Sequence, residues 1–149
     1  MFDTPERYGT VTRVLHWGMA LLFAAQFVSA GARALLPRGD ALRDSLWSYH
    51  TTLGMTLFLL VILRGVWALI NLSRRPGHEG KLGRFAKYGH LAIYGLMIVV
   101  PGIRILAAAG SERGLTYLGL QIFASRETEI GWMQLPSVLH GEMGWLLSA

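Results

Sequence analysis

Four histidines stand within or beside long apolar stretches of this 149-residue chain, where ionisable side chains are costly and usually mark function. The chain has no cysteine, which excludes thiolate zinc sites, iron–sulfur clusters and covalently attached haem. Two neutral imidazoles that face each other across a helix bundle can instead hold a haem iron from both sides. The four candidate ligands are His16, His50, His90 and His140.

The alternative is that these are ordinary interfacial histidines at helix ends, and the residue one turn further on helps to decide. Side chains at i and i+4 share a helix face, so the residue four positions after a haem ligand would lie against the porphyrin and has to be small. The residues at that offset are Gly54 after His50, Gly144 after His140, Ala20 after His16 and Tyr94 after His90.

Glycine in a helix costs up to about 1 kcal/mol relative to alanine, so its recurrence at this offset indicates that space is needed there. Glycine also serves close helix packing in membranes, which keeps the alternative open. On this test His50 and His140 form one ligand pair, His16 is a ligand without an evident partner, and His90 is the weaker candidate. His78, in "RRPGHEGK", is interpreted as a solvated loop residue.

Two arginines lie at membrane depth. Arg64 is fourteen residues after His50, and Arg104 is fourteen residues after His90. That spacing is about 21 Å along a helix and returns to nearly the same face. Both guanidinium groups are predicted to bind haem propionates or a quinone head group, the alternative being that they reach the interface from helix ends. Arg13 completes the candidate cofactor-binding residues.

The composition indicates the elements that position these side chains. Hydrophobic residues make up 52% of the chain, charged residues 15%, and the mean hydropathy is +0.39, which is too apolar for a soluble domain of this length. Apolar runs cover residues 14–36, 46–72 and 88–109, and each is long enough to cross a hydrocarbon core of about 30 Å. A fourth run starts at Pro136 and is interpreted as a helix cut short, or as a re-entrant stub.

The predicted fold is therefore an all-α integral membrane four-helix bundle, with its fourth helix truncated in this chain. Residues 1–149 form one transmembrane haem-binding domain, with helices at about 12–36, 46–72, 86–109 and 136–149 onward. Because consecutive helices alternate in direction, His50 and His140 should lie near one face of the membrane. His16 and His90 should lie near the other, so the histidines form two layers.

Lysine and arginine near the helix ends predict the orientation. Seven of them flank one side and five the other, which favours a cytoplasmic N-terminus. The first group is Arg7, Arg13, Arg74, Arg75, Lys81, Arg84 and Lys87, and the second is Arg33, Arg38, Arg43, Arg113 and Arg126. The net charge of +5 forms no continuous basic face, so nucleic acid is not expected as a partner.

Several motifs together resemble the bacterial cytochrome b561 family, which are membrane di-haem b cytochromes related to the cytochrome b subunits of formate dehydrogenase and nickel–iron hydrogenase. The matching pieces are "RVLHW" in the first helix, "PRGD" and the histidine of the second, "GHLAIYGLMIVVPG" in the third and "LHGEMG" in the fourth. They cover nearly the whole chain, and their order makes the resemblance fairly specific.

This resemblance implies two b haems and one-electron transfer across a bacterial inner membrane. The outer haem would be held by His50 and His140. The inner haem would be held by His16 and a further histidine of the fourth helix that lies beyond Ala149, or by His90 if the chain ends there. Quinone is the implied substrate, and the lipid bilayer and a redox protein are the implied partners.

Three functions remain open at this point. The first is a quinone-linked di-haem oxidoreductase that acts alone, as in a relative that oxidises superoxide and reduces ubiquinone. The second is a cytochrome b electron-transfer subunit that anchors a peripheral dehydrogenase. The third is a non-redox membrane protein with incidental histidines. Outer arginines could steer superoxide, but nearby acids nearly cancel their charge, and no catalytic acid or base is identifiable.

Overall fold

The computed structural model describes residues 2–74 and 80–147 of the chain. Arg75 and His78, which the sequence assigns to the basic connection, lie outside the described residues, as does the side chain of Lys81. The chain divides into two compact units, Met1–Leu91 and Ala92–Ala149, which we call the N-terminal and C-terminal units and describe separately.

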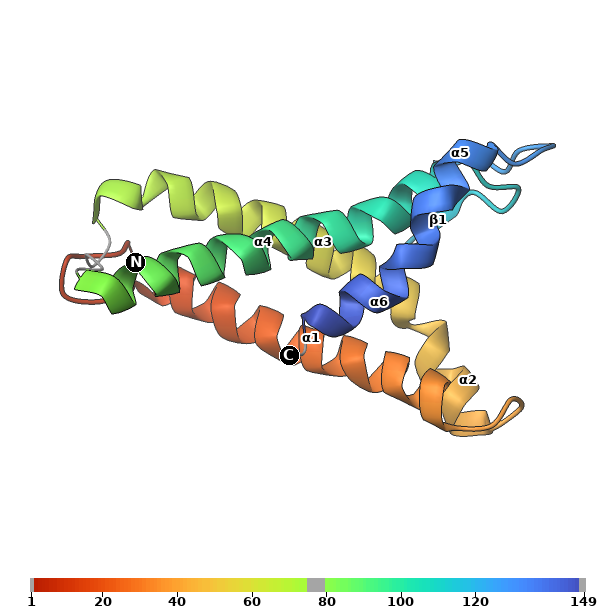
Figure 1. The fold of residues 1–149 in the computed structure, drawn as a ribbon, viewed down its shortest axis with the longest axis horizontal. Coiled ribbons are helices and arrows are strands. Elements are labelled where there is room, and N and C mark those ends of the chain that lie inside the picture. The colour runs from red at the N-terminus through yellow and green to blue at the C-terminus, as the bar shows by residue number, and fades with distance from the viewer. Residues whose placement is uncertain (1, 75–79, 148–149) are drawn as a thin grey trace. The chain divides into compact units, whose positions relative to one another are not determined.

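Helices account for most of the described chain, and Figure 1 labels them in order. The elements are α1 (Thr10–Leu35), α2 (Ala41–Ser48), α3 (His50–Ile70), the 3-10 turn η1 (Leu72–Arg74), α4 (Gly80–Ala109), β1 (Leu115–Tyr117), β2 (Leu120–Phe123), α5 (Gly131–Gln134), the 3-10 turn η2 (Leu135–Val138) and α6 (Leu139–Leu146).

Three helical segments are long and apolar enough to cross a membrane: Thr10–Leu35, Ala41–Ile70 and Leu82–Ala109. Only 11% of the most apolar window of each is buried inside the protein. Leucines such as Leu21 and Leu69 are more than 70% exposed, which would be untenable over so large an area in water. The helices therefore present their apolar surface to lipid, and the predicted all-α integral membrane bundle is confirmed.

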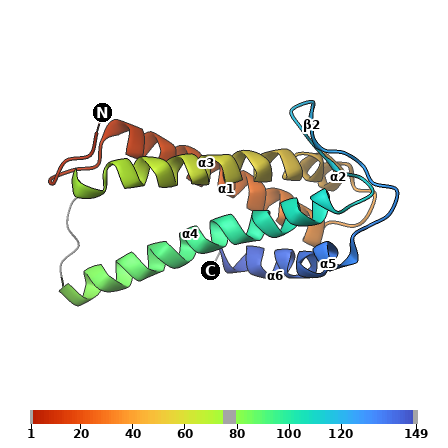
Figure 2. The same ribbon diagram turned by 90° about the horizontal axis from the view of Figure 1, so that it is seen from above.

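In the N-terminal unit, α1 and α3 lie side by side and run in opposite directions (Figures 1 and 2). Met19 of α1 and Leu57 and Val61 of α3 are at most 4% exposed and form the seam between the two helices. Because the outward faces remain apolar, this narrow seam and its polar contacts provide the packing inside the unit.

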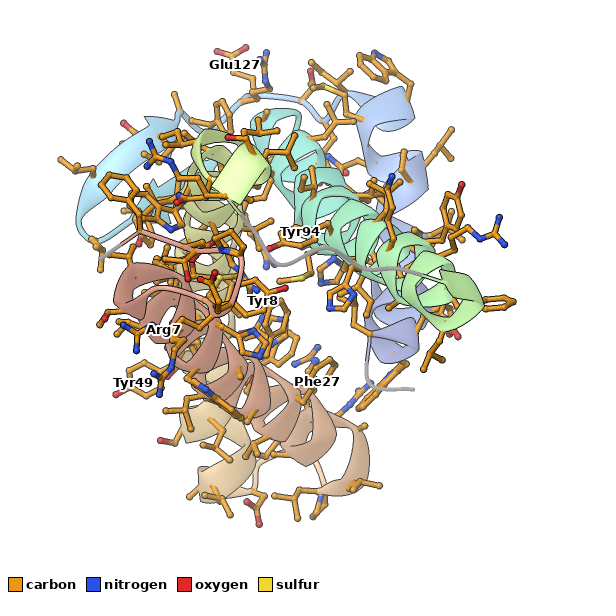
Figure 3. The ribbon with its side chains drawn as sticks, turned by 90° about the vertical axis from the view of Figure 1, so that its left-hand side faces the viewer. Arg7, Tyr8, Phe27, Tyr49, Tyr94 and Glu127 are labelled. Carbon is orange, nitrogen blue, oxygen red and sulfur yellow. The ribbon has the colours of Figure 1, made fainter. Side chains whose placement is uncertain are left out.

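The second predicted helix, at about 46–72, begins earlier in the structure and is divided. Asp40 caps α2 by accepting hydrogen bonds from the backbone N–H groups of Leu42 and Arg43, at 2.9 and 3.0 Å. Such a side chain satisfies donors that a helix start leaves open. Tyr49 separates α2 from α3, is 62% exposed and projects outward (Figure 3). This division places His50 at the first residue of α3.

Buried polar groups fasten the N-terminal segment to the far end of α3. Asp3 is 2% exposed, and its carboxylate accepts hydrogen bonds from Gly9 N–H at 2.7 Å and from the Thr12 hydroxyl at 2.6 Å. The backbone N–H of Asp3 donates to the side-chain oxygen of Asn71 at 3.2 Å. Trp67 donates its indole N–H to Thr12 at 2.9 Å. The network joins the loop that holds Arg7 and Tyr8 (Figure 3) to both helices.

The C-terminal unit contains a feature that the helix-based prediction omitted, a two-stranded antiparallel hairpin between α4 and α5. Leu118 and Gly119 form its two-residue turn, and both have positive φ angles, 49° and 82°. In the segment "LTYLGLQIF", the alternation of apolar and polar residues is too short to predict strands from the sequence. Gly114, also at positive φ, lies with its backbone against Phe123 and Ala124, where an added Cβ would clash.

The fourth apolar run starts earlier than Pro136. It forms α5, then η2 with Pro136 in its first turn, and then α6. In Figure 2 this segment runs back alongside the later part of α4, and Gln134 donates from its side-chain amide to the Ala107 carbonyl oxygen at 2.8 Å. The third helix also begins earlier than expected, at Gly80 rather than near residue 86.

Candidate functional site

His50 is held at both ring nitrogens by polar side chains of α1. Its Nδ1 atom lies 2.8 Å from the hydroxyl oxygen of Ser29, and its Nε2 atom lies 3.1 Å from the amide nitrogen of Gln26. The same Gln26 nitrogen donates to the His50 backbone carbonyl oxygen at 3.1 Å. The imidazole is therefore fixed in the seam between α1 and α3.

An aromatic and a cationic side chain stack beside this imidazole. The Trp47 ring of α2 lies 4.3 Å from the His50 ring, with 20° between their planes. The Arg33 guanidinium lies over the Trp47 ring at 4.2 Å from its centroid, a favourable cation–π arrangement. The position of α2 thus sets the plane of the His50 ring, which the predicted single helix did not anticipate.

His140 lies in the second position of α6, inside the C-terminal unit. Its Nδ1 atom is 2.8 Å from the backbone carbonyl oxygen of Val100 in α4. A carbonyl oxygen only accepts hydrogen bonds, so Nδ1 carries the proton and Nε2 presents its lone pair. Metal-binding histidines usually have this arrangement, in which the second ring nitrogen donates to a carbonyl or carboxylate.

His16 of α1 and Arg64 of α3 come together in the N-terminal unit. A guanidinium nitrogen of Arg64 lies 3.0 Å from Nδ1 of His16. Arginine can only donate, so Nδ1 accepts and the proton of a neutral His16 lies on Nε2. That tautomer is opposite to that of His140, so iron binding through Nε2 of His16 would require the ring proton to move to Nδ1 and Arg64 to leave that atom.

His90 lies eleven residues into α4, because that helix begins at Gly80 rather than near residue 86. It is not a residue of the first turn. Its Nδ1 atom lies 2.6 Å from the Ala86 carbonyl oxygen one turn earlier, which places the proton on Nδ1. His90 is exposed, and this tautomer leaves the lone pair on Nε2, so its chemistry fits ligation, although its helix position differs from that of the other three histidines.

The spaces predicted beside Gly54 and Gly144 differ in what surrounds them. Among the described residues, the one neighbour within 4 Å of an ideal Cβ at Gly144 is a methyl group of Val100, at 4.0 Å, so a side chain could be added at this position. An ideal Cβ at Gly54 would lie 3.2 Å from the amide nitrogen of Gln26. The space beside Gly54 is thus filled by a side chain that could rotate away.

The structure does not bring all predicted site residues together. Arg13 and Arg104 are exposed on α1 and α4, and the charge of Arg104 acts on His140 within the C-terminal unit. His50 belongs to the N-terminal unit and His140 to the C-terminal unit. Their pairing across a haem therefore stays a prediction, as does the number of haems.

Sequence reasoning missed Gln26 and Ser29. A signal was present, because both interrupt the apolar stretch "AAQFVSAG" and their spacing of three places them on one helix face. Polar side chains in a membrane helix are expected to meet a partner inside the protein. The identity of that partner, His50, depends on the register of α1 against α3, which the sequence did not reveal.

The donor set fits haem, as the two best-placed imidazoles show. His140 is in the iron-binding tautomer, and His50 has one ring nitrogen bonded to the Ser29 hydroxyl and the other to the Gln26 amide. Haem needs only two axial protein ligands, and neutral imidazole is among its common ones. His16 would also be suitable as a haem ligand if Arg64 no longer donated to its Nδ1 atom.

Comparison with known proteins agrees with this chemistry. Residues 7–149 match the family described as prokaryotic cytochrome b561. The chain is also similar to the protein named cytochrome b561 homolog 2 from Escherichia coli strain K12, at 26% identity over 141 residues, which covers 92% of this chain and 68% of that protein. Since the family match spans nearly the entire sequence, this chain belongs to the prokaryotic cytochrome b561 family, as a bacterial multi-pass membrane cytochrome of the b type that binds haem and transfers electrons.

Proposed function

We propose that this protein transfers single electrons between a donor on the outer side of the bacterial inner membrane and the quinone pool. Two b haems would carry the electrons, one held by His50 and His140 and the other by His16 with a second inner histidine. Haem supplies the one-electron chemistry when bound, and the protein orients it, excludes water and tunes its potential.

The observation that carries this proposal is the hydrogen bond from His140 to the Val100 carbonyl oxygen. It orients the ring and fixes the tautomer in which Nε2 carries the lone pair that iron would need. The bond also raises the basicity of the imidazole, which favours the oxidised state of a bound iron. An incidental interfacial histidine would have no need for a partner on a neighbouring helix.

Arg64 is proposed to serve the inner site in two ways. Its guanidinium donates to Nδ1 of His16 at 3.0 Å. When the His16 ring binds iron, the same guanidinium can turn to a haem propionate or a quinone oxygen, for which arginine is well suited. Arg13 and Arg104 are proposed for similar contacts at the two membrane faces.

Superoxide is the donor we propose to test first. Each superoxide would lose one electron and leave as dioxygen, and two such electrons with two protons would convert one ubiquinone to ubiquinol. The charges near α2 do not strongly favour anions, because Asp40 caps the helix and Arg43 is paired with Asp44 at 3.0 Å. A redox protein that docks at this face is therefore the alternative donor.

The first experiment measures haem per chain by pyridine haemochrome in the detergent-purified, full-length protein, with spectra of the reduced and oxidised states. Wild type should hold two b haems. His50→Ala and His140→Ala should each lose the same haem spectrum, whereas Glu142→Gln, an exposed change beside His140, should lose none. If His50→Ala and His140→Ala lost the spectra of different haems, the pairing of these two histidines would be contradicted. Wild-type protein without haem would overturn the proposed function.

The second experiment mixes the haem-loaded protein with ubiquinone and a superoxide source. Quinol formation that superoxide dismutase abolishes would support an enzyme that acts alone. Rapid oxidation of pre-reduced haem by quinone, without any reaction with superoxide, would retain the quinone link and replace the donor by a protein partner. Failure of both reactions at full haem content would reject the quinone link itself.

A further inference from the structure

Two α1 side chains bind the two ring nitrogens of His50, and their hydrogen bonds have a definite direction. Ser29 is 1% exposed, and its hydroxyl donates to the Gln26 backbone carbonyl oxygen at 2.7 Å. A hydroxyl has one proton, so toward Nδ1 of His50, at 2.8 Å, the same oxygen must accept. The proton of the ring therefore lies on Nδ1.

The other side of the ring leads to the same assignment. The Gln26 amide nitrogen has two protons, and it faces both Nε2 and the carbonyl oxygen of His50, each at 3.1 Å. If the amide were turned over, its oxygen would face the His50 carbonyl oxygen, and two acceptors would repel each other. Gln26 thus donates to a lone pair on Nε2, and His50 has the iron-binding tautomer.

Metal binding by the His50 ring would affect its hydrogen bonds with Ser29 and Gln26 differently. The bond at Nδ1 can persist, because ligation uses only Nε2, and such a bond orients the ligand. The bond at Nε2 cannot persist, because one lone pair serves either the Gln26 amide or the iron. The Gln26 amide also fills the space beside Gly54, at 3.2 Å from an ideal Cβ.

The side-chain amide of Gln26 is only partly hydrogen-bonded in this position. Its side-chain oxygen is buried and has no hydrogen-bond partner among the described residues. An unsatisfied buried acceptor is costly, so this position of the amide is held less firmly than its two donor contacts alone would suggest. Ser29, by contrast, uses its proton and its oxygen fully.

We propose that Ser29 is the positioning residue for His50, and that Gln26 is a displaceable cap on the iron-binding nitrogen of the same ring. Ser29 keeps the Nδ1 proton in place with or without haem. Gln26 satisfies Nε2 before haem arrives and must leave that atom for haem to bind. This inference rests on the proposed role of His50 as a haem ligand and assigns the residues that prepare it.

The geometry predicts opposite effects for the two side chains. Ser29→Ala removes the acceptor of the Nδ1 proton, so the imidazole becomes less basic and free to rotate. Loss of such a partner typically weakens metal binding by about 10- to 100-fold. Gln26→Ala removes the cap and opens the space beside Gly54, so haem should associate several-fold faster.

The test titrates haem into the full-length protein purified without haem, and follows the Soret band for affinity and association rate. Redox titration and electron paramagnetic resonance of the loaded protein then report on the His50 ligand. We expect Ser29→Ala to bind haem about tenfold more weakly, with a higher midpoint potential and altered g-values of one haem. Ser29→Thr, which keeps the hydroxyl, should restore all three.

Ser48→Ala is the matched control, since Ser48 makes the same hydroxyl-to-carbonyl bond within its helix, at 2.7 Å, without touching a ring. A purely structural role of Ser29 would predict lost helicity or unchanged potential in Ser29→Ala, and either result would overturn the positioning role. Slower or unchanged haem association in Gln26→Ala would overturn the cap.

His50→Ala separates this inference from the proposed function. If His50→Ala keeps both haems, the proposed ligand is wrong and the inference fails with it. If His50→Ala loses one haem while Ser29→Ala and Gln26→Ala both behave as wild type, the ligand stands and only the roles of Ser29 and Gln26 are rejected.

Discussion

At the scale of single residues, the candidate ligands differ mainly in which ring nitrogen carries the proton. His140 donates from Nδ1 to a carbonyl oxygen, whereas His16 accepts at Nδ1 from Arg64. Only the first arrangement leaves Nε2 with a lone pair on a neutral ring. The neighbours of an imidazole thus decide whether it can bind iron as it stands or only after a cation moves.

The glycine beside His140 provides a prediction at this scale. Gly144→Leu should lower the haem content while the helix remains folded, because the side chain would occupy the room beside α6 and leucine favours helices over glycine by up to about 1 kcal/mol. Haem per chain and circular dichroism measure the two effects.

Gly141→Leu is the matched control, since an ideal Cβ at Gly141 has no neighbour within 4 Å among the described residues. Equal haem content in the two variants would show that Gly144 serves helix packing rather than the cofactor.

At the scale of elements, each unit is held by a few polar contacts in an otherwise lipid-facing surface. The α1–α3 pair is tied at one end by Gln26, Ser29 and His50, and at the other by Asp3, Thr12 and Asn71. Lipid supplies no hydrogen bonds and little apolar driving force between helices, so such contacts determine register.

Asn71→Ala tests the contact at the far end of α3. Asn71 is fully buried, and its side chain accepts from Asp3 N–H and donates to the Trp67 carbonyl oxygen at 2.9 Å. Leaving the Asp3 N–H buried without an acceptor should destabilise the protein by about 1 to 3 kcal/mol. The midpoint of thermal unfolding in detergent should fall accordingly, while the exposed neighbour change Ser73→Ala should have no effect.

Gly110→Ala tests the junction between α4 and α5. A Cβ at this position would approach the Met133 sulfur to 2.8 Å and the Met133 Cβ to 2.9 Å, closer than real contacts allow. The helices would have to separate, at a cost of about 1 to 3 kcal/mol typical of overpacking. Thermal unfolding measures the loss. Gly102→Ala, within α4, is the control, because an ideal Cβ there has no neighbour within 4 Å in the described part of the chain. Equal stability of both variants would contradict the close approach at Gly110.

At the scale of the whole molecule, the orientation in the membrane decides which haem meets which substrate. The arginine and lysine bias favours a cytoplasmic N-terminus, which puts the connection between α4 and α5 outside. The proposed outer donor site near His50 and His140 depends on this orientation.

Single cysteines can test the orientation cleanly, because the sequence has no native cysteine. Glu127, labelled in Figure 3, is exposed in the connection between α4 and α5. The Glu127→Cys variant should react with a membrane-impermeant maleimide in intact spheroplasts. Glu6→Cys should react only after the membrane is disrupted. The reverse pattern would invert the topology and exchange the two haem layers.

Composition and run length were enough to establish the membrane helices, because about 20 apolar residues in a row have no stable alternative to crossing the bilayer. The histidines and the two glycines one turn after His50 and His140 were also visible in the sequence, since their chemistry and spacing are local properties. The Asp40 cap is also a local feature and explains why α2 begins at Ala41, ahead of the apolar run that was used to predict this helix.

The partners of those histidines were decided by the tertiary structure. Ser29 and Gln26 meet His50 through the register of α1 against α3, and Val100 meets His140 through the packing of α6 against α4. Such contacts join residues 21 to 40 positions apart, so they follow from how helices pack and not from any local pattern. Residue type shows which groups can bind iron, whereas helix packing decides which ring nitrogen of each histidine carries the proton.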